Sequence, residues 1–207
     1  MGVIFDIGCS VGLWIEANYN TEDRFIGVEP HPEAFKAAQR RFKGKDNVEI
    51  INFIASDTDA GVVDFHICRE GQGEVSTASI EWVNRSRHDA TWDKIIQCTP
   101  ITIEQMVLLY GEPSYIKIDV EGYELNVLMG MIKKRCPLSF EYAEELKDEL
   151  IESVIYLEGL GYDEFYMQHA DEYTFRPDEY INYNDIINLI NTLIPERKQS
   201  WGMLHAK

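Results

Sequence analysis

The stretch that decides the fold is Val3-Ile4-Phe5-Asp6-Ile7-Gly8-Cys9-Ser10-Val11-Gly12. Its first half is rich in β-branched and aromatic residues, which a buried strand prefers. Gly8 and Gly12 then mark a point where the backbone must turn sharply or approach a ligand closely. A helix is expected over about residues 13–18, and its free N–H groups face that turn. The stretch therefore predicts a strand, a glycine turn and a helix, a junction that suits a nucleotide-like ligand.

The charge of the chain limits its partners. Asp and Glu number 36 against 19 Lys and Arg, which gives a net charge of −17 over 207 residues. A field of this sign repels polyanions and disfavours nucleic acids and anionic membranes. No stretch reaches the roughly 20 apolar residues that a membrane span needs, and no basic region precedes an apolar one as in a secretory signal. We expect a cytoplasmic protein without a membrane span, as a monomer or a homo-oligomer.

The cysteines and tryptophans give no chemical signal of their own. The four cysteines are scattered, and no Cys or His pair has the spacing of metal ligands. The sequence therefore predicts reduced thiols and no metal site. The tryptophans could line a substrate pocket, but we interpret them as packing residues: they are Trp14, Trp82, Trp92 and Trp201.

Alternating strands and helices predict an α/β fold in which parallel strands are joined by right-handed crossovers. Strands are expected over 24–29, 47–54, 62–67, 94–99, 115–120, 137–142 and 162–167. Helices are expected over 31–43, 102–110, 125–132 and 144–160. A last helix over about 185–194 and a polar tail would form a C-terminal helical extension, 168–207, beyond a core of 3–167. The prediction is a single domain over 1–207.

The strand over 115–120 is unusual because Lys117 and Asp119 alternate on one of its faces. Parallel strands that are covered on both faces are normally almost entirely apolar. A buried lysine or carboxylate is costly unless it is paired or faces a cleft. We therefore expect Lys117 to pair with Asp119, and Asp119 to reach a cleft at the strand end.

Three known motifs can be compared with the opening stretch. Gly8-Cys9-Ser10-Val11-Gly12 has the form of a hydrolase nucleophile elbow, but that fold needs earlier strands and an earlier loop for the oxyanion hole. A dinucleotide site needs two further glycines where the pyrophosphate approaches the backbone. S-adenosylmethionine has no pyrophosphate, and it fits the residues better.

Each part of S-adenosylmethionine has candidate contacts at this edge of the sheet. Asp6 would accept from the ammonium group or order the turn, while Gly8 and Gly12 would let the backbone come close. Glu29 ends the second strand and would accept from both ribose hydroxyls, as an acid roughly 20 residues after the glycine loop does in dinucleotide sites.

Further residues complete the predicted cofactor site. The backbone N–H of Cys9 would meet the ligand, and Ser56 and Asp57 would reach the adenine edge. Asp119 would lie beside the sulfonium. Ser10 and Pro30, which belong to the same two turns, are the remaining members of the set.

Several stretches together resemble the FkbM family of class I methyltransferases. Asp6–Gly12 looks like the first motif of these enzymes, and Val28–Phe35 and Ile116–Glu124 resemble motifs of FkbM members. Ala55–Asp57 and Ser139–Glu141 stand where that family has similar stretches. The resemblance implies a Rossmann-like three-layer sandwich with a mostly parallel, seven-stranded sheet and a terminal antiparallel hairpin. It also implies methyl transfer from S-adenosylmethionine, usually to a hydroxyl oxygen.

The predicted chemistry rests on three acids at the ends of core strands. Asp119 would lie nearest the methyl group, with Glu121 or Glu141 as the base or as an acid that orients the substrate. The acceptor would be a sugar, a glycan or another small molecule. No N-terminal lid is expected, because nothing precedes the first strand in this sequence.

Two alternatives remain open from the sequence. The chain could be a non-catalytic binding module with the methyltransferase fold. A lysine–aspartate pair is also similar to ribose methyltransferases that act on RNA, although the acidic composition disfavours that acceptor.

Overall fold

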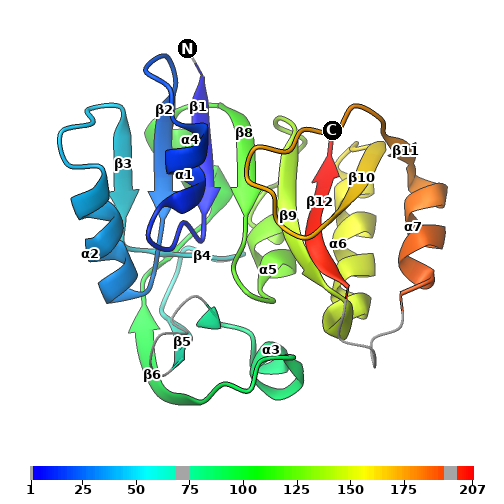
Figure 1. Ribbon diagram of the computed structural model, residues 1–207, viewed down its shortest axis with the longest axis horizontal. Coiled ribbons are helices and arrows are strands. Elements are labelled where there is room, and N and C mark those ends of the chain that lie inside the picture. The colour runs from blue at the N-terminus through cyan, green and yellow to red at the C-terminus, as the bar shows by residue number, and fades with distance from the viewer. Residues whose placement is uncertain (1, 69–74, 194–199) are drawn as a thin grey trace.

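The computed structural model describes residues 2–68, 75–193 and 200–207 (Figure 1). The strands are β1 (Val3–Ile7), β2 (Arg24–Val28), β3 (Val48–Ile51), β4 (Ile54–Ala55), β5 (Val63–Cys68), β6 (Trp92–Cys98), β7 (Pro100–Ile101), β8 (Pro113–Ile118), β9 (Leu138–Ala143), β10 (Glu164–His169), β11 (Ile181–Asn182) and β12 (Trp201–Ala206). The helices are α1 (Leu13–Asn18), α2 (Pro32–Arg41), α3 (Ile80–Arg85), α4 (Ile103–Tyr110), α5 (Glu124–Met129), α6 (Lys147–Gly159) and α7 (Tyr183–Asn191), with a 3₁₀ turn over Glu144–Leu146. Among the helices in these ranges, none is long and apolar enough to cross a membrane.

The main sheet has eight strands in the order β11-β10-β12-β9-β8-β1-β2-β3. The pairs from β9 to β3 are parallel, whereas β12, β10 and β11 pair with their neighbours in antiparallel fashion. The predicted Rossmann-like α/β fold is confirmed, including the antiparallel end of a mostly parallel sheet. The resemblance implies seven strands, whereas the main sheet has eight, of which β11 is a two-residue strand at the edge.

The prediction of a helical extension with a polar tail is wrong for the last strand. Residues 201–206 form β12, which lies between β9 and β10 in the middle of the antiparallel part. Leu204 pairs with Phe140 on one side and with Met167 on the other. All residues of β12 after Trp201 are buried, so this segment completes the core. The predicted last helix is present as α7 and ends at Asn191, and residue 194 lies outside the described residues.

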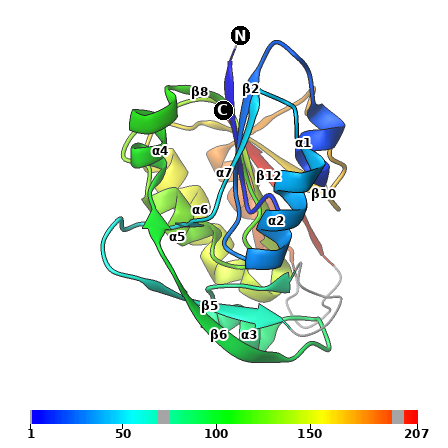
Figure 2. The ribbon, with the colours of Figure 1, turned by 90° about the vertical axis from the view of Figure 1, so that its left-hand side faces the viewer.

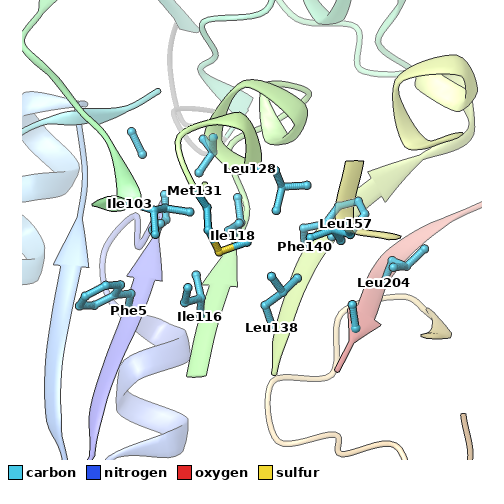
Figure 3. Packing of buried hydrophobic residues seen from close by; sticks show 14 of the residues in the cluster. Phe5, Ile103, Ile116, Ile118, Leu128, Met131, Leu138, Phe140, Leu157 and Leu204 are labelled. Atoms are coloured by element: carbon cyan, nitrogen blue, oxygen red, sulfur yellow. The ribbon is translucent and has the colours of Figure 1, made fainter. Parts of the chain in front are cut away.

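Helices cover both faces of the sheet and make three layers (Figure 2). On one face, α1 and α2 pack over a cluster that includes Trp14, Phe25 and Phe42. On the other, α4, α5, α6 and α7 cover the larger cluster. Figure 3 shows the centre of this cluster, where strand residues such as Phe5 and Phe140 meet helix residues. This packing fixes the strands whose ends carry the site.

Two predicted strands lie outside the main sheet. β5 and β6 pair with each other in a separate antiparallel sheet. Together with α3, this pair lies beyond the end of the main sheet to which the parallel strands point (Figure 1). The strand expected over 47–54 is also divided, because the chain leaves the sheet after Ile51 and the Asn52 amide donates to the carbonyl oxygen of Glu29 at 2.8 Å.

Candidate functional site

A cavity of about 260 Å³ lies at the edge of the sheet where the parallel strands end. Four strands contribute to it: β1 through the loop that follows Ile7, β2 through Glu29, β8 through Asp119 and β9 through Glu141. Open α/β sheets bind their ligands at this edge. The volume is close to the lower end of the range for small-molecule pockets, about 300 Å³.

The glycine loop forms one wall of the cavity through Gly8, Cys9 and Ser10. The N–H groups of Gly8 and Cys9 both donate to the carbonyl oxygen of Val28, at 2.9 and 3.0 Å. Gly8 has a φ of 77°, and a Cβ atom there would lie 1.7 Å from the carbonyl oxygen of Asp119. Glycine is therefore required at this position because the loop packs directly against the end of β8.

Glu29 links this loop to the start of α2. Its Oε2 accepts from the N–H of Ser10 at 2.8 Å, and its Oε1 accepts from the N–H of His31 at 2.7 Å. Burial raises the pKa of Glu29 to about 7, although these two hydrogen bonds act in the opposite direction. Glu29 and Pro30 both line the cavity, as a cofactor-binding role requires.

Lys117, which also lines the cavity, forms a buried ion triad. Its Nζ lies 3.0 Å from Oδ2 of Asp119, the predicted partner, and 3.4 Å from Oδ1 of Asp6. Burial alone would lower the pKa of Lys117, but the carboxylates of Asp119 and Asp6 have the larger effect, so the pKa lies above its usual value. Burial raises the pKa of Asp6, which is 0% exposed and is not among the residues that line the cavity. Asp6 therefore lies behind the cavity wall, and Asp119 faces the cavity.

The three predicted catalytic acids come together in the cavity. Carboxylate oxygens of Asp119, Glu121 and Glu141 all lie within 4.8 Å of one another. Burial, followed by the charges of Asp119, Glu121 and Glu124, raises the pKa of Glu141 well above its usual value. Three carboxylates at this separation could share a proton or hold a metal ion. A metal site made of carboxylates alone gives no signal in the spacing of cysteines and histidines.

The turn after β8 is held in place by Glu124. Its Oε1 accepts from the N–H groups of Val120 at 3.0 Å and Gly122 at 3.2 Å. Burial raises the pKa of Glu124 to about 7. The Thr77 hydroxyl donates to the carbonyl oxygen of Glu121 at 2.6 Å, and Glu121 has a φ of 57°. These contacts fix the backbone that carries Glu121 into the cavity.

Three other predicted cofactor residues do not line the cavity directly. Gly12 is the N-cap of α1, with a φ of 87°. The Ser56 hydroxyl donates to Asp57 at 3.0 Å and lies 3.2 Å from the hydroxyl of Tyr123. Tyr123 does line the cavity, so Ser56 contacts a residue of the wall without being part of the wall itself.

Three cavity residues from the C-terminal part of the chain were not predicted from the sequence. Asp171, Tyr173 and Trp201 all line the cavity. The Asn18 amide of α1 donates to the carbonyl oxygen of Tyr173 at 3.1 Å and holds this segment over the site. Burial raises the pKa of Asp171 to about 6. The interpretation of the tryptophans as packing residues is incomplete, because Trp14 and Trp201 also form part of the wall.

Comparison with solved structures supports the fold. Fibrillarin from Aeropyrum pernix, crystallised with natively bound S-adenosyl-L-methionine, has a TM-score of 0.51 and 11% identity, over 100% of this chain and 66% of that chain. The Methanococcus jannaschii fibrillarin pre-rRNA processing protein has a TM-score of 0.51 and 13% identity, over 99% of this chain and 65% of that chain. At these identities the likeness shows the fold alone, and the chain spans about two thirds of the length of either fibrillarin.

The family is shown by its sequence model. No curated protein matches the chain. The family model of the methyltransferase FkbM domain matches residues 6–164, most of the chain, and includes the glycine loop, Glu29 and the three acids. The family that the motifs indicated is thereby confirmed. The chain belongs to the FkbM methyltransferase domain family.

Proposed function

We propose that the chain is an S-adenosylmethionine-dependent O-methyltransferase that acts on a hydroxyl group of a sugar, a glycan or another small molecule. The observation that carries the proposal is the cavity at the ends of β1, β2, β8 and β9. It brings the glycine loop, Glu29 and three carboxylates together around about 260 Å³.

The cavity residues fit the cofactor in shape and charge. Each oxygen of Glu29 accepts one backbone N–H and keeps a second lone pair, so the carboxylate can also accept from the two ribose hydroxyls. Lys117 is already neutralised by two carboxylates, so the acids that line the cavity leave it negative and suited to a cationic ligand. When bound, S-adenosylmethionine supplies a methyl group on a positively charged sulfur, which retains the electron pair of the broken carbon–sulfur bond.

Glu141 is the base of the proposed reaction. A hydroxyl nucleophile must lose its proton as it is methylated, and a carboxylate with a raised pKa is a better match for this transfer. Asp119 is fixed by Lys117 at 3.0 Å and orients the hydroxyl, while Glu121 receives a second hydrogen bond from the acceptor. Positioning of this kind contributes much of the rate increase in a reaction whose donor is already activated.

The charge of the cavity separates this proposal from its alternatives. The described lining carries five carboxylates against one cation, Lys117, and this net negative charge would repel the phosphates of an RNA acceptor. A binding module without activity has no use for a half-buried carboxylate with a raised pKa. We also propose that residues 1–207 form one domain. We propose in addition a reducing, cytoplasmic compartment, because all four cysteines lie in the described part of the chain and none forms a disulfide.

Calorimetric titration with S-adenosylmethionine tests the cofactor and the role of Glu29. The wild-type chain should bind, and Glu29→Gln should bind about 1–3 kcal/mol more weakly, because the NH₂ group that replaces one carboxylate oxygen can only donate and leaves one ribose hydroxyl without an acceptor. Glu33→Gln, an exposed change in the first turn of α2, is the matched control and should bind like the wild type. Absence of binding by the wild type would end the cofactor assignment, and unchanged affinity in Glu29→Gln would remove Glu29 from the ribose site.

A further inference from the structure

The chain between β10 and β11 crosses the end of the main sheet. In Figure 1 the crossing segment, residues 170–176, runs in front of β12 and β9 toward β8 before the chain returns to β11. The carbonyl oxygen of Tyr173 accepts from the Asn18 amide of α1 at 3.1 Å, and the Arg176 guanidinium donates to Oδ1 of Asn18 at 2.6 Å. The same guanidinium lies 5.6 Å from the centre of the Tyr115 ring on β8. The segment therefore reaches from the antiparallel part of the sheet to the helix that follows the glycine loop.

The crossing segment begins with a sharp turn at Ala170. Its N–H donates to the carbonyl oxygen of Trp201 at 2.8 Å, and its φ of 61° lies in the left-handed region, which a residue with a side chain seldom adopts. Gly202 makes this packing possible, because a Cβ atom there would lie 2.7 Å from the nitrogen of Ala170. Strained backbone of this kind persists only where the surrounding structure holds it, and it is common beside ligand sites. The next residue, Asp171, lines the cavity.

The half-buried side chain of Asp171 has no partner of its own. Within the described residues it forms no hydrogen bond and no ion pair. Burial raises its pKa to about 6, the charge of Lys117 acts against this shift, and the charges of Asp119 and Asp6 add to it. Lys117 is already engaged, because its Nζ lies 3.0 Å from Asp119 and 3.4 Å from Asp6. A cationic group of a ligand would therefore stabilise the ionised form of Asp171.

S-adenosylmethionine brings two positive groups to the cavity, a sulfonium and an ammonium. The ammonium carries N–H donors, and such a donor must come within about 3 Å of an acceptor oxygen. Asp6 was one candidate for this acceptor from the sequence, but its side chain is 0% exposed and does not line the cavity. Asp171 does line the cavity, and it lies close enough to the ion triad for the charges of the triad to shift its pKa.

We propose that Asp171 accepts a hydrogen bond from the ammonium group of S-adenosylmethionine, and that the crossing segment is part of the cofactor site. Asp6 instead stays paired with Lys117 behind the cavity wall. The two ends of the cofactor are then held from opposite sides of β1. Glu29 follows β2, which is the neighbour of β1 on one side, whereas the crossing segment comes from the side of β8, the other neighbour.

The crossing segment lies outside the residues that define the family. The family model ends at residue 164, and the segment begins at residue 170. The inference rests on the proposed function, because it needs S-adenosylmethionine as the ligand. It adds one binding residue to that site, and a change at this residue should affect one end of the cofactor only. The two proposals are therefore separable by experiment.

Calorimetric titration with three ligands tests the role of Asp171. S-adenosylmethionine carries both positive groups, S-adenosylhomocysteine carries the ammonium alone, and methylthioadenosine carries neither. Asp171→Asn keeps the size of the side chain and removes its charge. This variant should bind the first two ligands about tenfold more weakly, as expected for one hydrogen bond to a charged group, and should bind methylthioadenosine like the wild type.

Three further variants serve as comparisons. Asp178→Asn removes an exposed carboxylate from the same connection between β10 and β11, and it should bind all three ligands like the wild type. Asp171→Glu restores the charge on a longer side chain and should recover part of the lost affinity. Glu29→Gln should weaken binding of all three ligands, since each contains the ribose. Asp171→Asn should fold at least as stably as the wild type, because burial disfavours the charge that it removes.

The outcomes separate the two proposals. If Asp171→Asn binds S-adenosylmethionine and S-adenosylhomocysteine as tightly as Asp178→Asn does, the role of Asp171 is wrong and the cofactor assignment stands. Equal losses for all three ligands would also contradict it, because methylthioadenosine has no ammonium group. A loss confined to S-adenosylmethionine would overturn it as well, since Asp171 would then act on the sulfonium. If the wild type binds none of the three ligands, the proposed function fails first.

Discussion

Replacing Lys117 by methionine measures what the buried ion triad contributes to stability. Methionine has a similar length and no charge, so the change removes the cation and keeps most of the packing. Asp6, which is fully buried, then loses its ion-pair partner, and neither of its carboxylate oxygens has a hydrogen-bond partner within the described residues. Asp119 is affected less, because 24% of its side chain is exposed to water.

The size of the effect follows from the geometry. For two unit charges 3.4 Å apart at an effective dielectric constant of about 20, Coulomb's law gives about 5 kcal/mol. Asp6 can avoid part of this loss by taking up a proton, which costs about 4 kcal/mol at pH 7 for a carboxyl group of ordinary pKa. The free energy of unfolding should therefore fall by about 3–4 kcal/mol at pH 7. The loss should shrink by about 1.4 kcal/mol for each unit that the pH is lowered.

Urea unfolding at pH 7 and at pH 5.5 checks both numbers. Lys36→Met, an exposed change on α2, is the control for the substitution itself. The double variant Lys117→Met with Asp6→Asn should recover most of the lost stability, since no buried charge is then left unpaired. A loss below about 1 kcal/mol, or one that is the same at both pH values, would refute the reasoning.

Three further predictions concern the loop, the base and the turn. Gly8→Ala should lower the free energy of unfolding by at least about 2 kcal/mol in urea, because the methyl group would meet the carbonyl oxygen of Asp119 at 1.7 Å and φ is 77°. Glu141→Gln should lower kcat by about a hundredfold or more in a labelled-methyl assay, and the wild-type rate should rise with pH as this half-buried carboxyl loses its proton. Thermal stability should fall between pH 5 and pH 8, because Glu124, with a pKa of about 7, binds protons more tightly in the folded than in the unfolded chain.

Each of these predictions has its own control. Gly44→Ala changes a glycine with a φ of 85° and nothing within 4 Å, so it should show only the backbone cost of about 1 kcal/mol; equal losses at both glycines would mean that the contact of Gly8 is unimportant. A Glu141→Gln enzyme at full rate would exclude Glu141 as the base. Glu124→Gln should flatten the pH dependence by up to about 3 kcal/mol, and an unchanged slope would place its cause elsewhere.

The local parts of the site could be predicted from sequence because they follow from short-range rules. The strand, glycine turn and helix over residues 3–18 are encoded by neighbouring residues, and the position of Glu29 follows from the end of β2. The meeting of Asp119 and Glu141 follows from another general rule, that parallel strands end at the same edge of a sheet.

Contacts that depend on the order of the strands could not be predicted in this way. The place of β12 between β9 and β10 is set by pairing across the sheet, which neighbouring residues do not specify. A signal was nevertheless present, since three of the four residues from Met203 to Ala206 are apolar, as is typical of a buried strand. Asp171 also follows the end of a strand at this edge, so the rule that found Asp119 could have found it.

The structural role of Glu29 could not be predicted from the sequence. Glu29 appeared as an acid that accepts from a ligand, yet in the structure it already holds the glycine loop through Ser10 and the start of α2 through His31. Periodicity and spacing give no information on such backbone contacts. They depend on how the turns after two separate strands fold against each other.

The position of β12 also has a consequence for how the chain acquires its structure during synthesis. On the ribosome, β9 and β10 emerge well before residues 201–206, and each keeps an open edge until that last strand arrives. Open strand edges pair readily with other chains. The nascent protein is therefore most exposed to aggregation in the interval before β12 is translated, and a premature stop a few codons upstream would leave that exposure permanent.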